Sequence, residues 1–251
     1  MDDSRTIPSD TADEGAGAWR DDLYWSVRRL GAGIGAGFLV GLIVGGIGGR
    51  LAMFVLRLTS DPLLRGVETD DGFRIGAFTQ DTLFLLLVGG ALGVLGGLFY
   101  LTVRSWLPAR RRPLLMAALA ATVGGSLVIH PDGIDFRVLD PLSLALAMFI
   151  LLPGLYGFAV SVLAEKLLLV AEGPRFAGLV WSWFPVLALF LAGPIGLVVL
   201  IVMGLGWALN RVSNFTTIWT SPGMAWVGRG ALLAGGLFAL YTLGKDIAEL
   251  V

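Results

Sequence analysis

Cysteine is absent from this chain of 251 residues, and histidine occurs once. The protein therefore has no disulfide bonds, thiolate nucleophiles or cysteine-ligated metal sites. Charge is also scarce, because Asp, Glu, Lys and Arg make up 15% of the residues, against about 25% in a typical soluble domain. No basic face of useful size is present, so the sequence predicts no nucleic-acid partner.

Recognisable catalytic motifs are missing as well. The chain has no phosphate-binding loop, no GxSxG motif, no HExxH motif and no pair of acids on one helix face. The apolar centres of the second to sixth predicted spans contain no ionisable residue, which disfavours ion-coupled transport. We therefore expect no cofactor, and an enzyme is the least supported class of function.

Long apolar segments fill most of the chain. Apolar residues make up 56% of the sequence, and the mean hydropathy is +0.81. A helix of about 20 apolar residues is long enough to cross a bilayer. The sequence predicts an all-α fold, a polytopic integral membrane helical bundle of about six transmembrane helices. The predicted spans are about 31–57, 82–103, 114–130, 141–164, 177–209 and 225–244.

The fifth predicted span is the hardest to count. Residues 176–209 are too many for one upright helix and too few for two spans with a turn. Trp181 and Trp183 precede Trp207 by 24 to 26 residues, or about 36–39 Å of helix. This spacing favours one tilted and bent helix with tryptophans at both interfaces. Two short spans are the alternative.

Residues 1–22 are polar, acidic and aperiodic, which predicts a disordered cytoplasmic tail. Residues 23–251 are predicted to form a single membrane-embedded helical domain. With six spans, eleven Lys and Arg residues lie on the side that holds both termini, and six lie on the other side. The positive-inside rule then places both termini in the cytoplasm. Sixteen arginines against two lysines indicate a GC-rich bacterial genome, so we expect the bacterial inner membrane.

Glycine recurs at every fourth position in the first two predicted spans. Residues four apart lie on one face of an α-helix, and a face without side chains lets another helix approach closely. We therefore predict that a glycine zipper brings these two spans together. The predicted helix-packing residues are Gly33, Gly37, Gly41, Gly45 and Gly49 in the first span and Gly89, Gly93 and Gly97 in the second.

Three charged residues near the end of the first span, Arg50, Arg57 and Asp61, are candidate functional groups. Arg50 is the single charge near a span interior, and an arginine inside a membrane is a functional candidate by default. However, 19 apolar or glycine residues precede it, so Arg50 also fits a helix-end anchor whose side chain reaches the interface. The sequence leaves both interpretations open, with the anchor favoured.

The loop at 60–80 is predicted to form a small external cap. Asp71-Gly72 lies between two short runs that fit strands, which is typical of a hairpin turn. The four acids and two arginines of this loop could bind a cation or a partner protein. A solvated loop without a ligand is the favoured alternative.

His130, Asp132 and Asp135 form the single histidine–acid cluster of the chain. Imidazole and carboxylate groups are metal ligands, which makes these residues a weak candidate metal site. One histidine without a second ligand motif is a poor signature, and Asp135 can instead pair with Arg137. We therefore predict no metal centre.

Two functions of different classes fit these features. The first is a non-catalytic scaffold or accessory subunit, whose glycine-rich helix faces pack against a membrane-protein partner or a second copy within the lipid bilayer. The alternative is a small permease or channel for a neutral solute or lipid. It would use helix breaks at Gly45-Gly46, Gly48-Gly49 and Pro153-Gly154 beside a cavity. A sensor acting through the outer loop lacks a cytoplasmic output domain.

Overall fold

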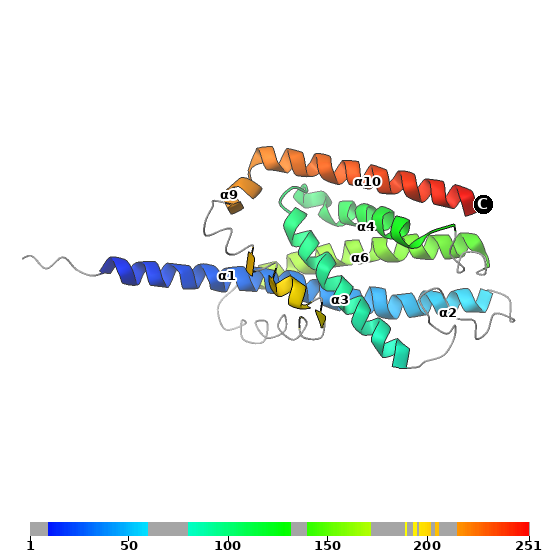
Figure 1. Cartoon of the computed structure of the whole chain (residues 1–251), viewed down its shortest axis with the longest axis horizontal. Coiled ribbons are helices and arrows are strands. Elements are labelled where there is room, and N and C mark those ends of the chain that lie inside the picture. The colour runs from blue at the N-terminus through cyan, green and yellow to red at the C-terminus, as the bar shows by residue number, and fades with distance from the viewer. Residues whose placement is uncertain are drawn as a thin grey trace, which may run out of the picture.

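The computed structural model of the chain describes most of the helical bundle. It covers residues 10–59, 80–131, 140–171 and 215–250, together with 189, 193–194, 196–201 and 204–205. Within these ranges the chain is helical and has no β-strand. Figure 1 shows the long helices lying roughly along one axis, with α3 crossing them at an angle.

The helices have the following bounds, with the labels of Figure 1. They are α1 (Asp10–Val40), the π-helix η1 (Gly41–Gly48), α2 (Gly49–Thr59), α3 (Gln80–Val103), the 3₁₀ helix η3 (Ala109–Arg111), α4 (Arg112–Val128), α6 (Leu142–Ala171), α9 (Phe215–Trp219) and α10 (Pro222–Leu250). Because α1, η1 and α2 follow one another directly, the chain is helical from residue 10 to residue 59.

Within the described residues, four helical segments are long and apolar enough to cross a membrane. They are Trp25–Leu56, Leu86–Val103, Leu142–Val170 and Pro222–Leu250, and they coincide with four of the six predicted spans. The helix predicted at 114–130 is present as α4. Its 17 residues make about 26 Å of helix, less than the roughly 30 Å of a hydrocarbon core.

The first helix begins earlier than its composition indicates. Residues 10–22 belong to α1, although their polarity predicts a disordered tail. Extending an existing helix needs no new nucleus, and the acids Asp10, Asp13 and Glu14 lie near its N-terminus, where negative charge is favourable. Residues 1–9 lie outside the described part of the chain.

α1 and α3 pack antiparallel through their glycines. A Cβ atom added at Gly37 would meet the carbonyl oxygen of Gly93, and one added at Gly41 would meet the carbonyl oxygen of Gly89. Gly97 lies in the same way against the carbonyl oxygen of Gly33. The two backbones therefore approach too closely for a side chain to fit between them.

The glycine contact weakens where the α-helix becomes the π-helix η1. A Cβ added at Gly45 would lie 3.6 Å from the Cα atom of Gly89, and one at Gly49 would have no described atom within 4 Å. A π-helix closes its hydrogen bonds between residues five apart. The contact therefore passes from Gly41 to Gly46, five residues on, and a Cβ added at Gly89 would lie 2.9 Å from the backbone nitrogen of Gly46. Gly49 does not join the contact.

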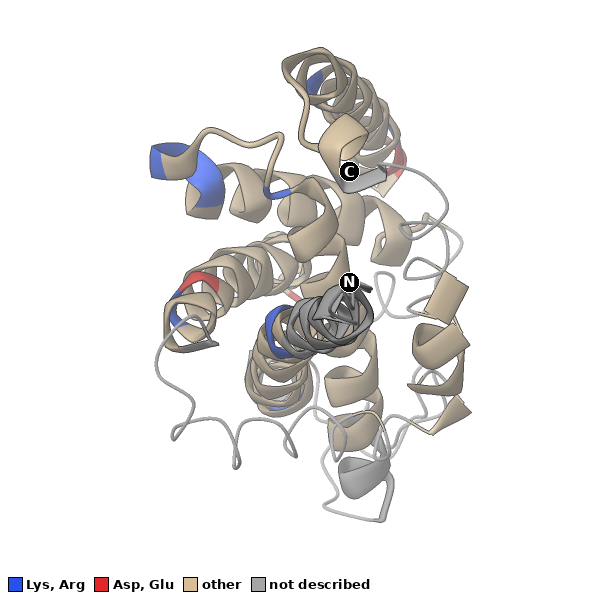
Figure 2. Cartoon of the chain, turned by 90° about the vertical axis from the view of Figure 1, so that its left-hand side faces the viewer, with Lys and Arg blue, Asp and Glu red and all other residues tan. Residues whose placement is uncertain are grey.

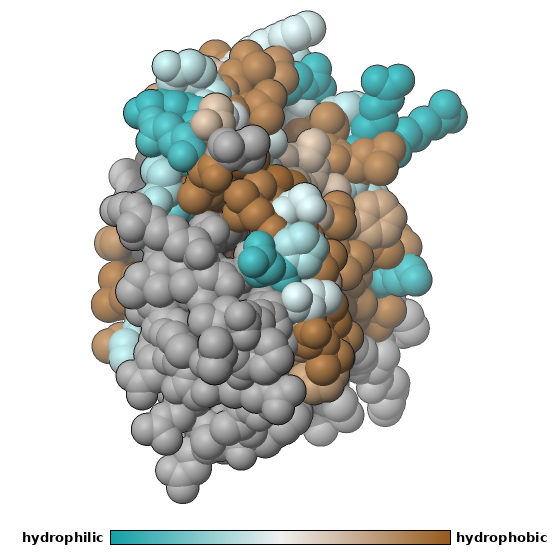
Figure 3. Space-filling view, turned by 90° about the vertical axis from the view of Figure 1, so that its right-hand side faces the viewer, coloured by the Kyte–Doolittle hydropathy of each residue, from teal (hydrophilic) through white to brown (hydrophobic). Residues whose placement is uncertain are grey.

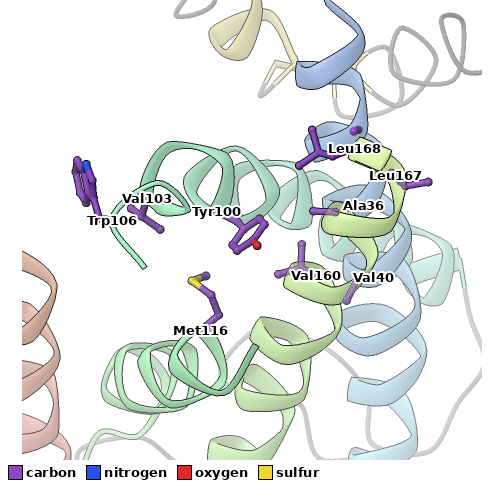
Figure 4. Close-up of a cluster of buried hydrophobic side chains, with 11 residues drawn as sticks. Ala36, Val40, Tyr100, Val103, Trp106, Met116, Val160, Leu167 and Leu168 are labelled. Carbon is purple, nitrogen blue, oxygen red and sulfur yellow. The ribbon is translucent and has the colours of Figure 1, made fainter. Parts of the chain in front are cut away.

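A buried apolar cluster fills the space between α1, α3, α4 and α6. Figure 4 shows Tyr100 from α3, Met116 from α4 and Val160 from α6 directed into this space. The α4–α6 contact also depends on small residues, because a Cβ at Gly157 would meet the carbonyl oxygen of Met116. The buried members of the cluster are Ala32, Ala36, Val40, Tyr100, Val103, Trp106, Met116, Val160, Ala164, Leu167 and Leu168.

α6 continues through Pro153 without interruption. The permease prediction includes a helix break at this proline. The proline ring lies against Gly124 of α4, and a Cβ added there would be 2.8 Å from the ring Cγ. The missing side chain of Gly124 thus leaves the room that the ring needs.

One end of the bundle, which we call the basic end, joins the middle of α1 to the ends of α3 and α6. Arg28 Nη2 donates a hydrogen bond of 3.2 Å to the carbonyl oxygen of Val170. Arg229 of α10 donates from Nε to the carbonyl oxygen of Trp106, at 2.6 Å. α10 therefore begins at the basic end.

The opposite end, which we call the C-terminal end, holds the last turns of α10. Leu243 packs there with Leu56, Ile129 and Ala145 in one buried cluster, and Asp246 lies 4.0 Å from His130. α10 therefore runs parallel to α4. The start of α1 and the end of α10 lie at opposite ends of the bundle (Figure 1), although the six-span interpretation predicts both termini on one side.

Most of the fifth predicted span, 177–209, lies outside the described residues. Gly193 has a left-handed φ of 57°, and a Cβ added at Gly196 would meet the carbonyl oxygen of Leu189. Glycine adopts this conformation without strain, so the chain bends at Gly193. On either side of this segment, α6 ends and α10 begins at the basic end.

Candidate functional site

A network of four polar side chains joins α3, α4 and α6 at the basic end. Glu165 Oε1 accepts hydrogen bonds from Tyr100 Oη at 2.5 Å, Arg104 Nε at 3.2 Å and Arg112 Nη1 at 3.0 Å. Arg104 Nη2 also donates to Glu165 Oε2 at 3.0 Å. One carboxylate therefore receives four hydrogen bonds from three donors, and we call this set the Glu165 network.

Local sequence places these groups. Tyr100 and Arg104 are four residues apart at the end of α3, so both project from one helix face. Arg112 is the first residue of α4, and Glu165 lies on the facing side of α6. The Tyr100 side chain is fully buried, whereas about a third of the Glu165 side chain, 32%, is exposed.

The geometry favours a structural role for the Glu165 network. A carboxylate that already accepts four hydrogen bonds has little capacity left to act as a base or a nucleophile. The fork of Arg104 binds both oxygens of Glu165, which fixes orientation as well as charge. Two guanidinium groups and one carboxylate leave a net charge of +1 at the junction of three helices.

A second set of contacts ties α9 and α10 to the end of α3. The Trp219 indole Nε1 donates to the carbonyl oxygen of Thr102 at 2.9 Å, and the rings of Trp106 and Trp219 lie 4.7 Å apart. Gly228 faces the Trp106 ring, where a Cβ would clash. Tryptophan is enriched at membrane–water interfaces because it combines an apolar ring with a donor.

Charge is distributed unequally between the two ends. Figure 2 faces the basic end and shows Lys and Arg on several helices. Among the side chains that the structure describes, the basic end has one acid, Glu165, and the C-terminal end has three, Asp140, Asp246 and Glu249. Lys245 is the described cation of the last turns of α10. The cations of the basic end are Arg28, Arg29, Arg104, Arg110, Arg111, Arg112, Lys166 and Arg229.

The charges predicted at the end of the first span are not brought together in the described structure. Arg50 is half-buried in α2, and Arg57 belongs to the same helix. Asp61 and the loop at 60–79 lie outside the described residues. The structure therefore adds no observation that favours a functional role for Arg50 over an anchoring one.

The candidate metal site is only partly visible. His130 is exposed and contacts the Leu127 carbonyl oxygen at 3.2 Å and Asp246 at 4.0 Å, whereas Asp132 and Asp135 lie outside the described residues. Within the described part, no group of three or more His, Asp or Glu side chains could hold a metal. His130 instead contributes to the contact between α4 and α10.

Sequence reasoning missed the Glu165 network, because Glu165, Arg104 and Arg112 all lie just outside the predicted spans 141–164, 82–103 and 114–130. One signal was available. Glu165 is the single acid between Pro141 and Ala171, in a segment apolar enough to span a membrane, and such an isolated acid needs a partner. What the sequence does not supply is the partner, since Arg104 and Arg112 come from other helices.

The helix α10 is the least covered of the long helices. In the most apolar stretch of α10, 11% of the residues are buried. In the most apolar stretch of the segment Trp25–Leu56, 61% of the residues are buried. Its large side chains Trp226, Phe238 and Tyr241 are 71%, 68% and 70% exposed. Its main contacts are with α4 and α9. Figure 3 views the bundle from the C-terminal end, where hydrophobic side chains make up much of the coloured surface.

Small residues interrupt this large apolar face. Cβ atoms added at Gly223, Gly230, Gly235 and Gly244 would meet no described atom within 4 Å. The exposed residues Ala231 and Gly235 are four apart, as are Gly230 and Ala234. This spacing repeats the one through which α1 and α3 pack.

Comparisons with protein-family models, with curated proteins and with solved structures find no match for this chain. The features of the bundle that bear on function are the exposed face of α10 and the cations of the basic end.

Proposed function

We propose that the protein is a non-catalytic membrane scaffold or accessory subunit, and that α10 is the helix that binds the partner. The observation that carries this proposal is the exposed small-residue face of α10, which comprises Gly230, Ala231, Ala234 and Gly235. Close approach of two helices in a membrane relies on such residues, because lipid offers no hydrophobic driving force between helices. The partner is a transmembrane helix of another protein or of a second copy.

The packing inside the bundle supports this assignment. The glycines of α1 and α3 face each other, and Gly157 of α6 faces α4. These faces are already occupied and are not available to a partner, although the sequence suggests the glycines of the first two spans for that role. Among the long helices, α10 combines a small-residue repeat with open space beside it.

We also propose an orientation in the membrane. The excess of arginine at the basic end, together with the positive-inside rule, supports a cytoplasmic location for that end. The start of α1 is then cytoplasmic, and the end of α10 lies on the outer side of a bacterial inner membrane. This orientation replaces the prediction that both termini are cytoplasmic.

In-cell photocrosslinking from α10 tests the proposed function. A photoreactive phenylalanine derivative at Phe238, which is exposed one turn beyond Ala234 and Gly235 on the same face of α10, should form a crosslinked product of defined mass in native membranes. The matched control is the same group at Leu155, an exposed position on α6. Equal crosslinking from both positions, or none from α10, would contradict the proposal.

A second variant separates binding from folding. Gly235→Leu adds a side chain where the described structure has open space, so the monomer should keep its stability while the crosslink from Phe238 is lost. Unchanged crosslinking in the Gly235→Leu variant would place the contact elsewhere.

A small permease for a neutral solute or lipid is the second candidate, and the π-helix η1 favours it. π-helical segments inside α-helices occur often at functional sites, and η1 interrupts the first membrane-length segment at Gly41–Gly48. Proteoliposomes containing the purified protein should then shrink and swell faster than empty liposomes in gradients of small neutral solutes. Identical rates across a solute panel would remove this candidate.

A further inference from the structure

The exposed arginines at the start of α4 lie directly beside an exposed apolar surface. Arg110 and Arg111 form the η3 turn, and both are exposed. Leu114, in the next turn, is 65% exposed, and Leu115 is exposed as well. Positive charge and uncovered apolar side chains therefore follow each other within six residues of one helix start.

From this juxtaposition we infer that the basic end binds an anionic phospholipid, with the headgroup phosphate on Arg110 and Arg111 and the acyl chains along Leu114 and Leu115. Arg112 and Arg104 are already paired with Glu165, so the exposed pair carries charge that the network does not neutralise. Basic clusters beside transmembrane helices recognise anionic headgroups in this way.

The surroundings favour a lipid over a free phosphate ion. A phosphate ion would need only the guanidinium groups of Arg110 and Arg111, whereas the adjacent apolar side chains of Leu114 and Leu115 fit acyl chains. The neighbouring Trp106–Trp219 pair is of the type found at the level of lipid headgroups. In a lipid bilayer the same charges also attract the anionic leaflet, which agrees with a cytoplasmic basic end. This lipid-binding inference does not depend on α10 binding a partner.

Binding of phosphatidylglycerol to the detergent-purified full chain, measured by native mass spectrometry, tests this inference. Phosphatidylglycerol should bind more tightly than phosphatidylcholine, and Arg110→Gln or Arg111→Gln should each weaken it about fivefold, with about 30-fold for the double variant. Both arginines are exposed, so these variants should fold normally. Lys245→Gln, at the other end, should have no effect.

Three results would overturn the inference. Equal binding of phosphatidylcholine would show that the charge of the headgroup is not recognised. Equal weakening by Lys245→Gln would show a non-specific charge effect. Competition by inorganic phosphate at the same concentration as the lipid, with no change in the Leu114→Gln variant, would identify a free-phosphate site instead.

Discussion

At the scale of single residues, two polar side chains connect helices that apolar packing alone would leave free to slide. Glu165 joins α6 to α3 and α4, and Tyr156 Oη donates to the carbonyl oxygen of Gly93 at 2.7 Å. Gly93 is also in contact with the backbone of α1. Each of these groups therefore acts where three helices meet.

Replacing Glu165 by Gln should lower the free energy of unfolding in detergent by about 1–2 kcal/mol. The variant leaves Arg104 and Arg112 without their counter-charge, and the partial exposure of the network keeps the effect below that of a fully buried pair. Glu249→Gln is the matched control, since Glu249 is exposed and 3.5 Å from Lys245. If both variants unfold alike, Glu165 does not hold the three helices together.

Tyr156→Phe should cost about 1 kcal/mol, the usual net value of one hydrogen bond. The ring stays in place, so only the bond to the Gly93 carbonyl oxygen is lost. Tyr241→Phe provides the comparison, because Tyr241 is exposed on α10 and should tolerate the change. Thermal unfolding of the two variants in one detergent measures the difference, and equal melting temperatures would count against the hydrogen bond.

At the scale of elements, glycine has two different consequences in this bundle. Gly37 of α1 and Gly93 of α3 each lie against the backbone of the opposite helix, whereas Gly230 and Gly235 of α10 have no described atom within 4 Å of an added Cβ. The same residue type therefore limits substitution on one helix and permits it on another.

Gly93→Ala should destabilise the bundle, whereas Gly230→Ala should be neutral or slightly stabilising. A Cβ at Gly93 would lie 2.7 Å from the Cα of Gly41 and would meet the Gly37 carbonyl oxygen, and neither backbone atom can move aside cheaply. At Gly230 the methyl group meets nothing, and alanine favours the helix by up to about 1 kcal/mol. Urea or thermal unfolding of the purified proteins measures the stability of both variants. If Gly230→Ala lost stability and Gly93→Ala did not, the close backbone contact of α1 with α3 at Gly93 would be refuted.

The sequence predicts much of the element scale because its signals are local. Apolar length locates the helices around 82–103 and 141–164, and the repeat of four locates the glycine faces. The π-helix η1 is not predictable in the same way, since its hydrogen-bond register depends on the neighbouring helices. The Glu165 network depends on contacts between residues 53 to 65 positions apart, which a single sequence does not encode in any readable pattern.

At the scale of the whole molecule, the path of the chain between α6 and α10 decides the topology. Counting apolar residues over 176–209 suggests one crossing, because 34 residues are too few for two full spans. The described features that bear on this count are the bend at Gly193 and the position of the end of α6 and the start of α10 at the same end of the bundle.

Single-cysteine labelling in intact cells tests this topology most directly, and the natural chain contains no cysteine to interfere. Ala109→Cys marks the basic end, and Glu249→Cys marks the C-terminal end. We expect a membrane-impermeant maleimide to label the Glu249→Cys variant in intact cells and the Ala109→Cys variant only after permeabilisation. Labelling of both variants under the same condition would place both positions on one side and contradict the arrangement of α10 described here.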